Sequence, residues 1–458
     1  MNVLLINPYQ TARKGNIWTS IQGAMPPLGL AYISSYLTAR GVENSILDMN
    51  IEQGDAAEQV KRIEGDYDII GITSMTGAVK HGYEIASECK KKFPKSRIVF
   101  GGVHATVMPE EVLSTGSVDY VFRGEGEESF YRFIKGDDIS GIPGISYRKD
   151  GKIFHNPDAP LVADLDTLPI PAYNKLKMEK YSPTLGSYKR LPAISMLATR
   201  GCPGMCTYCF GAFLGGKTRM HSVEYLIKEI KMLIKEYGIK EVLFYDDTFT
   251  VYRKKVMEFC ERIISDKIDI TWVCFSRVDT IDEETLALMK KAGCHQIMYG
   301  IESGSPEILR NINKKIDREK AIKAVRMTKK AGIECRATFM LGNPGETEET
   351  IMQTLKFAIE LEPDIALFNI TTPFPGTRMF DWARENGYLM TQDWLLYDLS
   401  NMVMRLPTIS HEKIEHYYRL AFKKFFLRPS YLLKRLFGLR SITELKNAVK
   451  AFFAIIRH

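Results

Sequence analysis

Two blocks of alternating short strands and amphipathic helices constrain the fold of this chain more than any other feature of its sequence. The first block covers residues 1–135, where apolar segments rich in Ile, Val and Leu alternate with helical ones. The expected strands are 2–6, 43–48, 68–73, 97–101 and 118–122, and the expected helices are 28–40, 55–64, 78–92 and 109–115. This alternation predicts an α/β domain with a doubly wound, Rossmann-like parallel sheet, and such sheets bind ligands beyond the carboxyl ends of their strands.

The second block, residues 191–395, repeats the alternation six times. Strands are expected near 193–198, 241–245, 271–275, 296–301, 335–341 and 365–371, with helices near 222–237, 253–265, 282–291, 318–331 and 346–360. Polar residues follow each of the six expected strands. Repeated strand–helix units of this kind can form a parallel barrel. Such barrels carry their active sites at the carboxyl ends of the strands, so we expect the functional groups there.

Two segments fall outside the blocks. Residues 136–190 form an expected linker with a hairpin at Asp150-Gly151. Residues 396–458 are helical in pattern and basic: the chain carries a net charge of +7, and residues 411–458 hold 11 Lys/Arg against 3 Asp/Glu. This region is interpreted either as a helical extension that covers the barrel or as an amphipathic surface that touches anionic lipid.

The bulk composition limits the class of protein. A chain of 458 residues is too long for one ordinary core, so two or three domains are expected. The sequence has no signal-peptide pattern at Met1 and no apolar run of about 18 residues, the length that a membrane span needs. Its eight cysteines, three of them clustered, favour a reducing compartment, so the expected location is the cytoplasm.

The clustered cysteines are the most specific chemical feature. Cys202, Cys206 and Cys209 are spaced C-x3-C-x2-C, and Tyr208 precedes the third. Cysteine thiolates hold iron–sulfur clusters, and three ligands on a four-iron cluster leave one iron open to a small molecule. A zinc site needs four ligands, and no further Cys or His occurs until His221.

With this motif the sequence resembles the radical S-adenosylmethionine (SAM) superfamily. The resemblance implies a partial (β/α)6 TIM-like barrel and a [4Fe–4S] cluster whose open iron binds SAM. Reduction of SAM there gives a 5′-deoxyadenosyl radical.

The resemblance also implies SAM contacts at the ends of the expected strands. Tyr208 is expected near the adenine, Asp246 near the amine, Ser276 or Arg277 at the carboxylate and Glu302 at the ribose hydroxyls. The remaining residues assigned to SAM are Ser303 beside Glu302 and the glycines of the fifth strand end, Gly342 and Gly345.

The first block resembles half of a cobalamin-binding signature, in which a serine strand end and a Gly-Gly turn hold the nucleotide tail. The residues assigned to cobalamin are Thr73, Ser74, Thr76, Gly101, Gly102, His104 and Glu125. The other half, D-x-H-x-x-G, is missing, because the first histidine is His81. Two interpretations follow: cobalamin binds without that histidine below the cobalt, or the fold persists without the cofactor.

Together these features resemble the cobalamin-dependent radical SAM class, which contains C-methyltransferases and the anaerobic Mg-protoporphyrin monomethyl ester cyclase. The expected function is methylation of an unactivated carbon in a small-molecule or lipid-like substrate, and cyclisation or rearrangement is the alternative. A tRNA methylthiotransferase is disfavoured, because Cys89 is the only cysteine before residue 202. The expected partners are a flavodoxin- or ferredoxin-type electron donor and the inner membrane face, with no nucleic acid.

Overall fold

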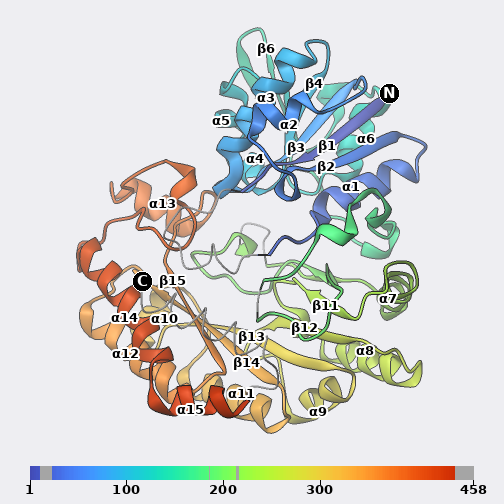
Figure 1. Ribbon diagram of the computed structural model, residues 1–458. Helices are drawn as coiled ribbons and strands as arrows, with labels where there is room; N and C mark the ends of the chain where they lie inside the picture. Colours follow the sequence, from blue (N-terminus) through green and yellow to red (C-terminus); the bar gives the residue numbers. More distant parts are fainter. Residues whose placement is uncertain (11–22, 185, 213–215, 439–458) are drawn as a thin grey trace.

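The computed structural model describes residues 1–10, 23–184, 186–212 and 216–438. Two α/β domains lie one above the other (Figure 1). The first contains a seven-stranded sheet with the order β2-β1-β3-β4-β5-β6-β7. Its parallel strands are β1 (Asn2–Asn7), β2 (Glu43–Asp48), β3 (Ile69–Thr73), β4 (Arg97–Gly101) and β5 (Tyr120–Phe122).

Alternate residues of β1 point to opposite faces of this sheet, which explains why helices cover both. Val3 and Leu5 belong to a cluster with α1 (Leu28–Thr38) and α6 (Glu127–Lys135). Leu4 and Ile6 belong to a second cluster with α2 (Ala56–Lys61), α3 (Val79–Lys92) and α5 (Pro109–Ser114). A short helix, α4 (Val103–Val107), follows β4. The doubly wound Rossmann-like fold is confirmed.

The hairpin expected at Asp150-Gly151 forms, and it joins the first sheet. Strands β6 (Ile145–Lys149) and β7 (Lys152–His155) pair antiparallel, and β6 also pairs antiparallel with β5. Asp150 and Gly151 both have positive φ, 52° and 75°, as a two-residue hairpin turn requires. The hairpin thus extends the sheet of the first domain.

The second domain is an open, all-parallel sheet with the order β15-β14-β13-β12-β11-β8. Its strands are β8 (Ala193–Met196), β11 (Glu241–Phe244), β12 (Thr271–Ser276), β13 (Cys294–Glu302), β14 (Glu334–Leu341) and β15 (Ile365–Ile370). The helices between them are α7 (Val223–Tyr237), α8 (Arg253–Ser265), α9 (Glu283–Lys291), α10 (Pro306–Asn311), α11 (Arg318–Lys330) and α12 (Glu348–Leu361). Sequential strand order with helical crossovers is the partial (β/α)6 barrel that was expected.

The C-terminal region covers one side of the barrel. It contains α13 (Arg378–Glu385), α14 (His411–Phe426) and α15 (Pro429–Gly438). Helix α14 packs on β15 and α12, and the rings of Phe422 and Phe425 lie 5.5 and 6.2 Å from that of Phe368. The side chains of 434–438 and all of 439–458, where most of the expected basic amphipathic pattern falls, lie outside the described residues. Within the described part, no helix is long and apolar enough to cross a bilayer.

Candidate functional site

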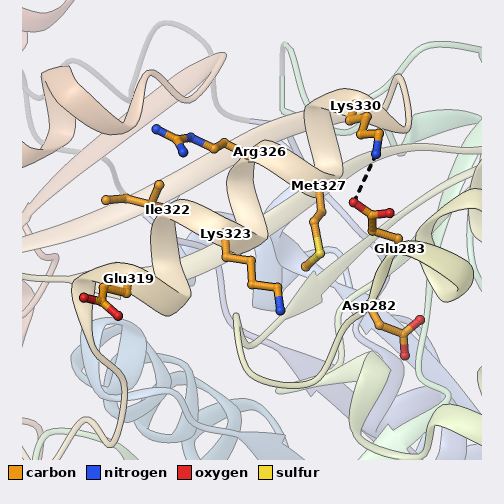
Figure 2. Close-up of a pocket in the computed structure, with 8 residues that line it drawn as sticks. All are labelled: Asp282, Glu283, Glu319, Ile322, Lys323, Arg326, Met327 and Lys330. Atoms are coloured by element: carbon orange, nitrogen blue, oxygen red, sulfur yellow. Dashed lines mark hydrogen bonds and ion pairs between the residues drawn. The ribbon is translucent and has the colours of Figure 1, made fainter.

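One hollow in the described part of the structure lies on the outer helices of the barrel, and a second lies at the strand ends. A groove of about 890 Å³ lies on the outer helices around α11. Figure 2 shows its lining, including the Lys330–Glu283 ion pair of 3.2 Å. None of the predicted site residues lines this groove. A smaller cavity of about 400 Å³ is lined by strand-end residues from both domains, and its volume lies in the range of ligand pockets.

The part of this cavity in the first domain is an apolar slot. Leu5, Val99, Phe122 and Phe130 line it together with Gly71 of β3. A Cβ at Gly71 would lie 3.1 Å from a Leu5 methyl and 3.7 Å from the Phe130 ring. The glycine therefore leaves the slot open between side chains of neighbouring strands, where a flat heterocycle can enter.

Four of the predicted cobalamin residues line this cavity: Thr73, Gly101, Gly102 and Glu125. Gly102 has φ +91°, and a Cβ there would lie 2.8 Å from the carbonyl oxygen of Ser74 and 2.9 Å from the Thr73 hydroxyl. Any side chain would thus strain the turn and clash with its neighbours. These features fit the nucleotide tail of cobalamin.

The other predicted cobalamin residues lie behind this surface. The Ser74 hydroxyl donates to Gly101 O at 3.0 Å and accepts from the Ala105 amide at 3.1 Å, which ties the two strand ends together. His104 is fully buried, with Nδ1 3.3 Å from the Thr76 hydroxyl and its ring 5.2 Å from that of Trp394. Neither His104 nor Thr76 lines the cavity.

The cysteine motif lies in a loop closed at its base by two short strands. Strands β9 (Thr199–Arg200) and β10 (Arg219–Met220) pair antiparallel on either side of it. Backbone amides donate to two of the sulfurs: Gly204 to Cys202 Sγ and Gly211 to Cys209 Sγ, each at 3.4 Å. Such donors stabilise thiolates that hold an iron–sulfur cluster.

Small residues keep the space beside the three thiols clear. A Cβ at Gly204 would lie 3.4 Å from Cys202 Sγ and 3.8 Å from Cys206 Sγ, and one at Gly211 would lie 3.6 Å from Cys209 Sγ. Burial is the largest factor that raises the pKa of the Cys209 thiol, to about 11, so iron binding must displace its proton.

None of the described cysteines forms a disulfide. In the part of the chain that the structure describes, no three His, Cys, Asp or Glu side chains are arranged to hold a single metal ion. A cubane needs a different arrangement, because each cysteine binds its own iron.

A buried charge pair lies next to the motif. Glu302 accepts hydrogen bonds from the Tyr208 hydroxyl at 3.2 Å and the Thr338 hydroxyl at 3.4 Å. It also pairs with Lys314 Nζ at 3.0 Å, and both side chains are 9% exposed. Lys314 in turn donates to the Tyr208 hydroxyl at 3.3 Å. Sequence reasoning missed Lys314, because a lysine in a loop twelve residues after Glu302 has no distinctive pattern.

The two residues predicted at the SAM carboxylate are placed differently. Arg277 forms a bidentate pair with Asp279, at 2.9 and 2.8 Å. A Cβ at Gly204 would lie 3.2 Å from Arg277 Nη1, so the guanidinium faces the cysteine loop. The Ser276 hydroxyl instead lies 2.5 Å from that of Thr250, inside a buried hydroxyl cluster.

Asp246 is a fully buried acid at this edge of the barrel. Its Oδ1 accepts from the Thr199 amide, while Oδ2 is buried without a hydrogen-bond partner. Burial is the largest influence on this carboxyl and raises its pKa to about 7. This oxygen is closed off in the structure, since Asp246 is 1% exposed and does not line the cavity. A cationic ligand group that reached it would satisfy it.

The remaining predicted SAM residues shape the backbone. Ser303 is buried and its hydroxyl lies 2.9 Å from that of Thr354 on α12. After β14, the Glu346 carboxylate accepts from the Gly342 amide at 2.6 Å and fixes the turn. Gly345 has positive φ, 82°, in the same turn.

Comparison with known proteins agrees with this geometry. Residues 196–358 match the model of the radical SAM superfamily, and residues 17–134 match that of the B12 binding domain. A protein of Pyrococcus horikoshii named as an uncharacterized methyltransferase is 38% identical, and the match covers 95% of this chain and 94% of that protein. The chain belongs to the radical SAM superfamily.

Two further proteins are similar to this chain over most of its length. The anaerobic magnesium-protoporphyrin IX monomethyl ester cyclase of Rubrivivax gelatinosus is 28% identical over 94% of this chain and 78% of its own length. The solved structure of the radical enzyme OxsB, with aqua-cobalamin and SAM bound, shares the fold at a TM-score of 0.76 and 17% identity, over 99% of this chain and 72% of OxsB. The radical SAM match gives the chain a [4Fe–4S] cluster and SAM as cofactors, and the B12 binding domain match gives it cobalamin. It is a radical SAM enzyme with methyltransferase and cyclase relatives, and its substrate is a small molecule.

Proposed function

We propose that this enzyme is a cobalamin-dependent C-methyltransferase that modifies an unactivated carbon of an apolar or lipid-like molecule. The observation that carries the proposal is the cavity between the domains. It joins the apolar slot, which is expected to hold the nucleotide tail of cobalamin, to the base of the cysteine loop. When bound, the cluster with SAM supplies a 5′-deoxyadenosyl radical, and cobalamin supplies the methyl group. The protein's part is binding, orientation and exclusion of water.

Each of these roles has candidate residues. Cys202, Cys206 and Cys209 hold the cluster. Arg277, which faces the cysteine loop, pairs with the SAM carboxylate in preference to Ser276. Glu302, oriented by Lys314, accepts from the ribose hydroxyls.

Three further residues bind at the edges of this site. Tyr208 contacts the adenine, and Asp246 receives the amine with its unpartnered oxygen. Tyr245 lines the cavity and stacks on Phe275 with ring centroids 5.5 Å apart. This aromatic pair favours an apolar substrate next to the cofactors.

The test uses anaerobically reconstituted protein with a chemical reductant. We expect about four irons per chain, as a single cubane contains, and cleavage of SAM. Cys206→Ala should lose both, whereas Cys89→Ala, a buried cysteine of the first domain, should keep both. Cleavage of SAM by Cys206→Ala would contradict the assignment.

Product analysis separates methylation from cyclisation. We expect a substrate mass gain of one methylene unit in cells with the gene compared with cells without it. Loss of hydrogen at unchanged carbon number would favour the cyclase-like reaction instead.

The partners are proposed on chemical grounds. Reductive cleavage of SAM needs one electron, so a flavodoxin or ferredoxin is the expected donor in the cytoplasm. Exposed Leu432 and Leu433 on α15, followed by basic residues in the sequence, favour contact with the inner membrane face. Co-sedimentation with anionic vesicles, and none with neutral ones, would support that contact, and equal binding to both would contradict it.

A further inference from the structure

Four charged side chains join the cobalamin-binding domain to the base of the cysteine loop. Glu125 and Glu127 precede and begin α6 of the first domain, and Arg200 and Arg219 are a cross-strand pair of β9 and β10. Arg219 forms a bidentate pair with Glu125, at 2.7 and 2.8 Å. Arg200 lies 2.7 Å from Glu127 and 3.4 Å from Glu125. We call these four residues the interdomain clamp.

The interdomain clamp is buried and anchored on both sides. Its side chains are 5–16% exposed. Glu125 also accepts from the Val162 amide at 2.6 Å, and Arg219 donates to Val162 O at 2.6 Å. Burial opposes ionisation of Glu125, but Arg219, Arg200 and the Val162 amide together outweigh it and lower the pKa of Glu125. Bidentate Arg–carboxylate pairs fix geometry as well as charge, so the clamp holds a defined spacing.

The clamp lines the candidate corrinoid cavity, and one of its arginines lies just before the cluster motif in the chain. All four of its residues line the cavity. Arg200 is two residues before Cys202 in the chain. The opposite side of the cysteine loop is fixed to the barrel, where the Thr207 amide donates to Ile312 O at 3.0 Å and Asn313 Nδ2 donates to Met205 O at 2.7 Å. The loop therefore bridges the two domains.

We infer that Glu125, Glu127, Arg200 and Arg219 couple corrinoid binding in the cavity to the stability of the iron–sulfur cluster. A corrinoid that fills the cavity packs against the clamp and against Gly201, and so restrains the base of the loop that carries the cluster ligands. By linkage, the cluster must favour corrinoid binding by the same free energy. This inference rests on the proposed function, because it takes the cavity as the corrinoid site.

The experiment measures cluster loss in the reconstituted full-length enzyme. An iron chelator is added anaerobically with and without hydroxocobalamin, and the cluster absorbance and released iron are followed. In the wild type, bound cobalamin should slow cluster loss about fivefold or more, where the low end of ordinary coupling between sites is taken as the rise in the barrier to iron release. Arg219→Met should bring this ratio close to one while cobalamin is present at saturating concentration, and Arg219→Lys should give an intermediate ratio.

A matched control and two refuting outcomes complete the test. Arg190 forms an equally bidentate pair with Asp269, at 2.7 and 2.8 Å, before the first barrel strand, so Arg190→Met should keep the wild-type ratio. Wild-type enzyme that retains cobalamin without slower cluster loss would overturn the inference but not the proposed function. Wild-type enzyme that retains no cobalamin would overturn both.

The most direct refutation would be a clamp variant in which cobalamin still slows cluster loss. An undiminished ratio in Arg219→Met shows that the clamp does not transmit the effect. If Arg219→Met assembles no cluster, Glu125→Gln carries the same expectation, because it keeps the side-chain shape and removes the charge.

Discussion

The buried pair Lys314–Glu302 allows a quantitative test of stability. Removal of the lysine cation leaves the Glu302 carboxylate buried without its charged partner. Both side chains are 9% exposed and their charged atoms are 3.0 Å apart. Loss of one partner from a buried pair costs about 3–5 kcal/mol. For a domain of barrel size, this corresponds to a fall of roughly 6–20 °C in Tm. We expect this loss in the cofactor-free Lys314→Met protein.

The control is a lysine pair at the surface. Lys330 pairs with Glu283 at 3.2 Å, but the two side chains are 74% and 62% exposed, so Lys330→Met should cost at most about 1 kcal/mol. The double variant Lys314→Met/Glu302→Gln should recover most of the lost stability, since it buries no uncompensated charge. Thermal unfolding under anaerobic conditions measures all four proteins. Equal losses for the two lysine variants, or no recovery in the double variant, would refute the reasoning.

Two further predictions concern one turn and one buried acid. Gly102→Ala should weaken cobalamin retention about tenfold, because a Cβ 2.8 Å from the Ser74 carbonyl oxygen displaces the turn that lines the cavity, and overpacking of this kind costs about 1–3 kcal/mol. Gly116→Ala, at φ +79° in open space, has the backbone strain without the clash, and equal retention by both variants would refute the role of the turn. Glu229 is fully buried with Oε2 unpartnered, and burial is the largest influence that raises its pKa from 4.5 to about 8. Because the folded state then holds the proton more tightly, this group lowers stability as pH rises from 4.5 to 8, by up to about 1.4 kcal/mol per pH unit. Glu229→Gln should remove that part of the slope in urea unfolding measured at pH 5–8, and an unchanged slope would contradict the assignment.

Most helices and strands were predictable from the sequence because they have a simple local pattern. The expected helix at 253–265 matches α8 (Arg253–Ser265), and the expected strand at 97–101 matches β4. Elements without such a pattern were not predicted. Strands β9 and β10 have two residues each, and their pairing depends on a loop closure that no local periodicity reveals.

Site residues were predictable where the chemistry fixes their spacing along the chain. Residues that meet only through packing were harder to predict. The cysteine motif is such a spacing, whereas Lys314 reaches Glu302 only through the path of the loop after α10. Glu125 was predicted as a cobalamin residue, and it does line the cavity. Its two arginine partners lie 75 and 94 residues away, and therefore only the folded structure shows its ion pairs.

The order of strands in the barrel has a consequence for how the chain is made. Each of the five barrel strands after β8 pairs with the barrel strand that precedes it in the chain, and the first sheet is complete once β7 has left the ribosome. Each domain can thus form in step with translation, amino-terminal half first. Helix α14, which covers β15, emerges after every strand of both sheets. A ribosome that stalls before α14 is made would leave the aromatic face around Phe368 exposed, where chaperones can bind it.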